Sequence, residues 1–180
     1  MAEAQSALWA PDPSESLGRT WGLDPSTAAL ALCVHDGVSY RTASVGLPRH
    51  KDPLRRLAAS LPVAQRFLEG AAHEWGLPSL VVVEQPAGTG HNVAPATWYA
   101  TGMTAMAVAN AINCPIHMVG PPSWKKEALG AGHGHAKKAE IAEWARAQGW
   151  VGASQDEADT CGIARCAYLR LVRSLTVRVT

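Results

Sequence analysis

Four carboxylates stand at positions where a folded chain could gather them. Asp24 follows the first strand-like segment, and Glu84 follows residues 80–83, the most apolar run of the chain. Asp156 and Asp159 are three residues apart at the start of the last helical segment, so both lie on one side of that helix. Hard divalent cations bind several carboxylate oxygens from different elements. Because no cluster of cysteines and histidines accompanies these acids, the set favours Mg²⁺ or Mn²⁺ over Zn²⁺.

Two such cations about 3.5–4 Å apart can activate water and stabilise the leaving oxygen of a phosphodiester. Structural explanations compete with this one: Asp24 could form a turn, and the helical aspartates could simply favour a helix N-terminus. Glu84 is harder to explain structurally, because a half-buried carboxylate needs a partner or an ion. Glu157 is left out of the set, since its spacing from Ser154 fits a capping box.

Two lysine pairs flank a segment rich in glycine and histidine, and they predict a surface that contacts phosphate groups. The pairs are Lys125, Lys126, Lys137 and Lys138. Such contacts position DNA without reading its sequence, although an isolated lysine pair is more commonly just solvated. His133 and His135 alternate within the segment, but no cysteine lies at zinc-ligand spacing, so we expect no zinc site.

A mixed sheet is expected to position these residues. Apolar and alternating segments predict strands at residues 21–24, 28–34, 38–45, 80–83 and 116–119. Asp36-Gly37 is a hairpin signal, so the first three strands should be antiparallel. The unbroken apolar run at 80–83 is typical of a buried parallel strand.

Helices are expected to cover both faces of that sheet. Helical spacing predicts them at residues 54–75, 96–113, 139–149 and 154–174. Pro62 removes a backbone donor, so the first helix could start again at Ser60. Residues 125–138 are expected to form a loop. The order βββ-α-β-α-β-α-α indicates an α/β fold.

Composition limits the class of protein. A chain of 180 residues with 47% apolar and 17% charged residues predicts one domain and excludes global disorder. The formal net charge of +1 rules out nucleic-acid binding by bulk charge. No apolar run is long enough to span a membrane, and the first 20 residues do not resemble a secretory signal. Four scattered cysteines suit reduced thiols in a cytoplasm. We expect residues 1–19 to be a flexible arm and residues 20–180 to be the domain.

Four motifs in this order resemble a known family. They are Gly22-Leu23-Asp24-Pro25-Ser26, Val83-Glu84-Gln85, the Gly-x-Gly-x-Ala-x-Lys stretch at residues 132–138, and Asp-x-x-Asp at residues 156–159. The combination resembles the RuvC-type Holliday junction resolvases of the RNase H-like superfamily, over about residues 20–172.

The resemblance implies an RNase H-like fold with a five-stranded mixed sheet. It implies that Asp24, Glu84, Asp156 and Asp159 are metal ligands, with two Mg²⁺ or Mn²⁺ ions per site, and that Lys138 assists catalysis. Lys126 lies near the second basic position of the family with one residue of difference in spacing, so Lys125 competes for that role. The implied protein is a homodimer in a bacterial or phage-infected cytoplasm, and it cuts four-way DNA junctions by symmetric nicks that leave 5′-phosphates.

The sequence also departs from the family. Related bacterial enzymes carry an aromatic residue soon after the Glu-Gln pair, whereas this chain has none from Gln85 until Trp98. The N-terminal arm is likewise unusual. Both departures would suit a member from a phage or mobile element, with a different way of opening junctions.

Other hypotheses remain at this point. A nuclease of the same superfamily could act on structured RNA. A protein that only binds branched DNA is disfavoured by four acids that would repel phosphates. Gly22 to Thr27 also resembles the first phosphate loop of sugar kinases and actin, but those proteins need two such domains. Met103 and Met106 could form a dimer face of the second helix, or ordinary core.

Overall fold

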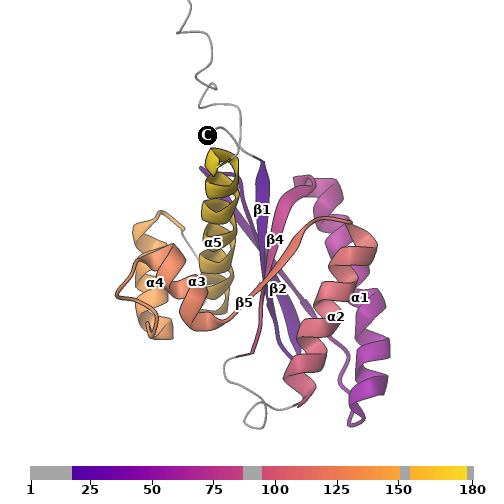
Figure 1. Cartoon of the computed structure of the whole chain (residues 1–180). Helices are drawn as coiled ribbons and strands as arrows, with labels where there is room; N and C mark the ends of the chain where they lie inside the picture. The colour runs from indigo at the N-terminus through magenta and orange to yellow at the C-terminus, as the bar shows by residue number, and fades with distance from the viewer. Residues whose placement is uncertain (1–17, 87–94, 151–154, 178–180) are drawn as a thin grey trace, which may run out of the picture.

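The computed structural model describes residues 18–86, 95–150 and 155–177. A five-stranded sheet lies between two layers of helices (Figure 1). The strands are β1 (Arg19–Pro25), β2 (Ala29–His35), β3 (Tyr40–Gly46), β4 (Pro78–Glu84) and β5 (Ile116–Val119). The helices are α1 (Pro53–Trp75), α2 (Pro95–Ala111), α3 (Pro121–Leu129), α4 (Lys138–Ala147) and α5 (Gln155–Val177).

The strand order is β3-β2-β1-β4-β5. β1 pairs antiparallel with β2, and β2 antiparallel with β3. β1 and β4 are parallel, as are β4 and β5. The predicted mixed five-stranded sheet with an antiparallel start is therefore confirmed.

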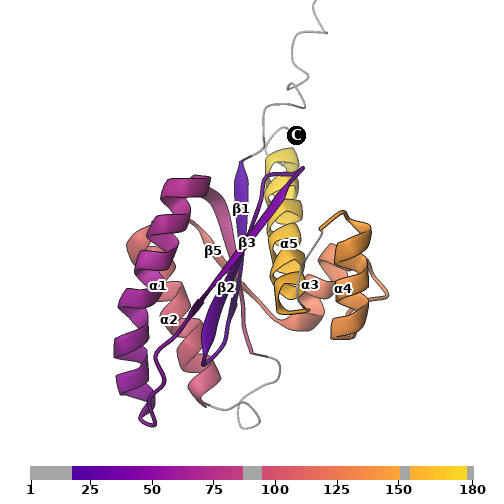
Figure 2. The same cartoon turned by 180° about the vertical axis from the view of Figure 1, so that it is seen from behind.

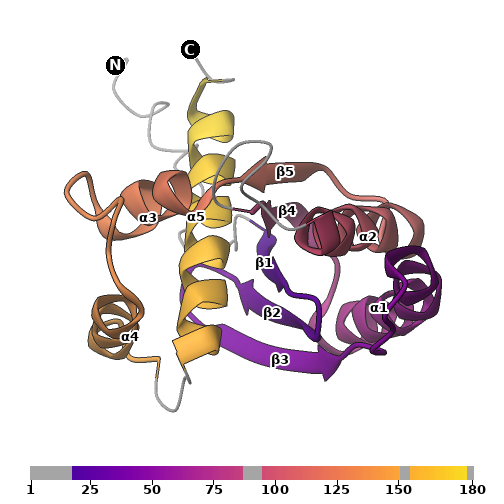
Figure 3. The same ribbon diagram turned by 90° about the horizontal axis from the view of Figure 1, so that it is seen from below.

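Strand alternation separates two cores. Trp21 and Leu23 of β1 and Val81 and Val83 of β4 pack against α1 and α2, which cover one face of the sheet (Figure 2). The residues between them face the other side, where α5 lies across the sheet and α3 and α4 lie beyond it (Figure 3). Since successive side chains of a strand point to opposite faces, Asp24 and Glu84 belong to the α5 face.

Two glycines allow α5 to approach its neighbours closely. A Cβ on Gly22 of β1 would lie 2.3 Å from the backbone nitrogen of Ala164, so α5 rests directly on β1. A Cβ on Gly162 would lie 2.5 Å from the ring of Trp124, so the indole of α3 fills that place. These contacts fix α3 and α5 against the strand that carries Asp24.

Two expectations about helices are wrong. The first helix runs through Pro62 without restarting at Ser60, because Pro62 lies on the exposed side, where water can satisfy the backbone carbonyl that it leaves without a donor. Residues 125 and 126 belong to helix α3 and not to a loop. That helix has prolines at its first two positions, where the missing backbone donors cost nothing.

Strand β1 begins at Arg19, one residue inside the expected arm of residues 1–19, and residues 1–17 lie outside the described part. The four cysteines are free thiols, with Cys33 Sγ and Cys161 Sγ 3.4 Å apart in the core. Across the described ranges, none of the helices combines the length and apolar character that a bilayer crossing requires.

Candidate functional site

The first two predicted acids lie side by side at one end of the sheet. In the parallel pair β1 and β4, Gly22 is opposite Val82 and Leu23 is opposite Val83. The next residues in this register are Asp24 and Glu84. Parallel strands end at the same edge, so the sheet brings together two carboxylates that are 60 residues apart in the sequence.

Helix α5 brings the third acid to the same end. Asp159 is only 8% exposed although it carries a carboxylate, and its charge acts on Glu84. Asp156 lies in the first turn of α5, three residues before Asp159, which places it on the same side of the helix. Its side chain lies outside the described part of the structure.

The electrostatics of Glu84 show that these carboxylates repel one another. Burial is the main cause that raises the pKa of Glu84 to about 8, and the charges of Asp24 and Asp159 raise it further. Lys125 and the indole N–H of Trp124 act in the opposite direction without cancelling the effect. At neutral pH this carboxyl is therefore mostly protonated until a cation offsets the repulsion.

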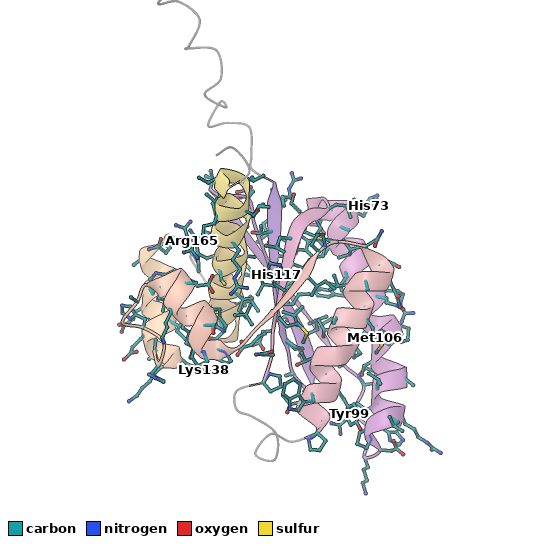
Figure 4. The ribbon with its side chains drawn as sticks, viewed as in Figure 1. His73, Tyr99, Met106, His117, Lys138 and Arg165 are labelled. Atoms are coloured by element: carbon teal, nitrogen blue, oxygen red, sulfur yellow. The ribbon has the colours of Figure 1, made fainter. Side chains whose placement is uncertain are left out.

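The four predicted lysines divide into two groups. Lys125 acts on Glu84, and its ammonium donates a hydrogen bond of 2.8 Å to the carbonyl of Ala136. Lys138 Nζ lies 4.0 Å from Asp159 Oδ2, with 58% of its side chain exposed. Figure 4 shows Lys138 at the end of the molecule at which α5 begins. These two lysines face the acids.

The other two lysines point elsewhere. The side chain of Lys126 lies over Gly134, where a Cβ would come within 2.6 Å of its Cε. Lys137 is exposed at the start of α4, where its backbone N–H donates to Glu140. Neither contacts an acid of the site in the described structure. Of the two candidates for the second basic position, the structure brings Lys125 to the acids and leaves Lys126 outside.

Sequence reasoning missed Trp124, which is buried beside Glu84. The missed signal was Pro121-Pro122, which favours a helix start and would have set the helical phase of the following residues. Glu157, which was left out of the metal set, accepts a hydrogen bond of 3.2 Å from Thr42 of β3. Its expected partner Ser154 lies outside the described residues.

The donor chemistry of the site fits a hard divalent cation. The acids offer carboxylate oxygens, and besides burial, the charges of Asp24 and Asp159 contribute to the raised pKa of Glu84. Within the described side chains, no three Asp, Glu, His or Cys groups are gathered closely enough to hold a metal ion. The predicted fourth ligand, Asp156, is not among those side chains. His133 and His135 are exposed in the connection between α3 and α4.

No protein-family model matches the chain, and no curated protein sequence matches it. Solved structures do. RuvC of Thermus thermophilus is 23% identical, covers 87% of this chain and 96% of its own, and has a TM-score of 0.64. The same enzyme in complex with a Holliday junction substrate is 22% identical, with 86% and 95% covered and a TM-score of 0.64.

The yeast mitochondrial Holliday junction resolvase Ydc2 is 16% identical, with 87% and 80% covered and a TM-score of 0.51. At identities this low, the structural similarity establishes a common fold and nothing more. The expected resemblance is thus confirmed at that level: this chain has the RNase H-like fold in the form that RuvC-type resolvases have.

Proposed function

We propose that this protein is a divalent-metal-dependent DNA endonuclease that resolves four-way junctions by paired symmetric nicks and leaves 5′-phosphates. The observation that carries the proposal is the environment of Glu84 on β4: burial, and then the charges of Asp24 from β1 and Asp159 from α5, raise its pKa to about 8. A buried concentration of negative charge costs stability, which is expected where a functional site requires it. The RuvC-type fold supports junction DNA as the substrate.

Asp24, Glu84, Asp156 and Asp159 would hold Mg²⁺ or Mn²⁺, and two ions are proposed. When bound, the ions would supply water activation and stabilisation of charge on the phosphate. The carboxylates contribute by fixing that place relative to the sheet, because β1 and β4 are central strands and α5 rests on β1 through Gly22. Such rigid positioning is what in-line attack on a phosphodiester requires.

Lys138 and Lys125 take different parts in the proposal. Lys138 combines an exposed side chain with a position 4.0 Å from Asp159, so its ammonium can reach a phosphate at the acids and stabilise developing negative charge. Lys125 is held by the Ala136 carbonyl and offsets the charge of Glu84. Lys126 and Lys137 would contact phosphates farther along the DNA.

A homodimer is proposed because two symmetric nicks need two active sites. Helix α2 offers a surface for it: Met106 is 42% exposed, whereas Met103 is buried at 1% and belongs to the core. Met106 therefore fits the expected dimer face, and Met103 does not.

The proposal places the protein in a cytoplasm, where four free thiols stay reduced.

The test is cleavage of a labelled, immobile four-way DNA junction beside a linear duplex of the same arm sequence. Each substrate is incubated with Mg²⁺, with Mn²⁺ and with a chelator, using wild type, Asp24→Asn and Asp156→Asn. Paired nicks in the junction alone, lost with chelator and in both variants, are expected. Tight binding without nicks would indicate a protein that recognises branched DNA but does not cut it. Structured RNA cut in place of DNA would move the activity to the RNA-processing branch of the superfamily.

A further inference from the structure

A basic segment outside the acid site spans the connection after β3 and the first turn of α1. Residues 49–56 carry four basic side chains against one acidic side chain, in a chain whose net charge is only +1. The single acid, Asp52, is the N-cap of α1 and accepts hydrogen bonds from the backbone N–H groups of Leu54 and Arg55. Figure 1 shows that α1 begins at the same end of the molecule as α5.

A pocket lies beside this segment, between α1 and α2. Its empty space is about 300 Å³, a volume that includes open solvent at the mouth. Its walls come from Ser26 and Thr27 in the turn after β1, from Arg56 and Ser60 of α1, and from Tyr99 of α2. Since that turn follows Asp24 after one residue, the pocket and the acid site share one connection of the chain.

Each wall of the pocket offers a different chemical group. Ser60 is only 3% exposed, and its hydroxyl has no hydrogen-bond partner among the described residues. An unsatisfied buried hydroxyl destabilises a fold, so a ligand that bonds to it would remove that cost. Nε and Nη2 of Arg56 donate to the carbonyl of His50, which holds the guanidinium in place. Tyr99 is 41% exposed and presents its ring at the rim.

We infer that this pocket is a second DNA subsite, which takes one unpaired nucleotide near the branch of the substrate. The base would stack on Tyr99, because aromatic rings bind bases regardless of sequence. Its polar edge would reach the hydroxyl of Ser60, and Arg56 would hold a neighbouring phosphate. The inference rests on the proposed function for its substrate class.

The position of the pocket supports a single strand that passes from one site to the other. Figure 4 shows Lys138 and Tyr99 at the same end of the molecule, on opposite sides of the sheet. The C-terminal end of β1, with Asp24, lies between the layers to which these two residues belong. The remaining exposed cations of the segment, Arg49, Lys51 and Arg55, extend a phosphate-binding surface beyond the pocket.

Binding measured by fluorescence anisotropy with chelator present tests the subsite without cleavage. The probes are a four-way junction with two unpaired thymidines at the branch, a fully paired junction and a linear duplex. Tyr99→Ala is expected to weaken binding of the first probe roughly tenfold, with Tyr99→Phe near wild type. Arg56→Ala should weaken it severalfold and lower the salt slope by about one. The duplex should respond least to either change.

Arg66→Ala is the matched control, because Arg66 is exposed on the same helix about 15 Å farther along. Ser60→Ala separates function from folding: the melting temperature should hold or rise, while affinity for the unpaired branch falls. If wild type cuts junctions but all three pocket variants bind like Arg66→Ala, the subsite is overturned and the proposed function stands. If wild type binds no DNA, both are overturned.

Discussion

The two ends of the sheet differ in how their carboxylates are surrounded. At the hairpin between β2 and β3, Asp36 accepts hydrogen bonds from the backbone of Val38 and Ser39 and from the Ser39 hydroxyl. These bonds outweigh partial burial and lower the pKa of Asp36 to about 2. At the other end, burial and neighbouring acids raise the pKa of Glu84 to about 8. One carboxylate is fully supplied with donors, and the other is placed among like charges.

The histidine at the hairpin end also has hydrogen-bond partners for its polar atoms. Nδ1 of His35 lies 3.0 Å from the Ser39 carbonyl, and Nε2 lies 3.0 Å from the Tyr40 hydroxyl. Because a carbonyl only accepts, Nδ1 donates, and Nε2 then accepts from Tyr40. Burial lowers the pKa of His35 to about 4, so the ring is neutral. The hairpin end is thus built for stability, whereas the acid end keeps an excess of charge that a cation would relieve.

The largest expected difference between the ends is in cleavage. Asp159→Asn should lower the single-turnover rate on a four-way junction at least about a hundredfold, as loss of an electrostatic group at a reacting phosphate does. Asp36→Asn should leave the rate within about twofold and lower the free energy of unfolding by about 1 kcal/mol, since the Ser39 hydroxyl loses its acceptor while the two backbone bonds to Oδ1 remain without the charge. Equal rates for the two variants would remove the functional distinction between the ends.

A second prediction concerns the lysines at the acid end. Lys138→Ala should lower the cleavage rate about ten- to a hundredfold with little change in junction affinity, because Lys138 Nζ lies near Asp159 and would act on the reacting phosphate. Lys126→Ala should instead weaken binding a fewfold and leave the saturated rate alone, since its side chain lies over Gly134. Cleavage rate at saturating enzyme and junction affinity are measured separately for each variant. If Lys126→Ala lowered the rate and Lys138→Ala lowered only the affinity, the two lysines would exchange roles.

The acids at this end of the sheet could be predicted from the sequence, because the ends of strands can be predicted from it. An apolar run that stops at Glu84, and a strand that stops at Asp24, place two acids at one edge in any parallel arrangement. The choice between Lys125 and Lys126 was not accessible in the same way. Adjacent residues of a helix point about 100° apart, so their roles depend on where α3 begins, and that segment was expected to be a loop.

The pocket between α1 and α2 had no sequence signal at all. Its walls come from a turn and two helices whose residues are far apart in the chain. Ser60 drew attention only as a helix start, whereas the structure places it inside an uninterrupted α1. The side chains that line the pocket are brought together by packing between separate elements, and no local sequence pattern predicts that packing. Gly22 is the intermediate case, because its motif was seen but its close contact with α5 was not.

A third prediction concerns stability without metal. The pKa of Glu84 is raised from 4.5 to about 8, so its favourable contribution is fully present below pH 4.5 and is lost as pH rises through 8. Glu84→Gln cannot ionise. With chelator, this variant should nearly match wild type near pH 5 and be more stable at pH 8.5 by up to about 5 kcal/mol. Denaturant unfolding at both pH values measures this difference, and a gap that does not change with pH would contradict it.

The smallest expected effect lies at the hairpin end. Tyr40→Phe removes the hydroxyl that donates to His35 and should cost about 1 kcal/mol of stability at pH 7, with no change in cleavage. The contribution of His35 is present above pH 6.5 and is lost as pH falls through about 4, because the folded state disfavours the charged ring. Burial is the main cause of that shift and the phenyl ring keeps it, so wild type and variant should lose stability in parallel between pH 6.5 and 4. Unfolding curves that converge at acid pH would show that the hydroxyl, and not burial, holds His35 neutral.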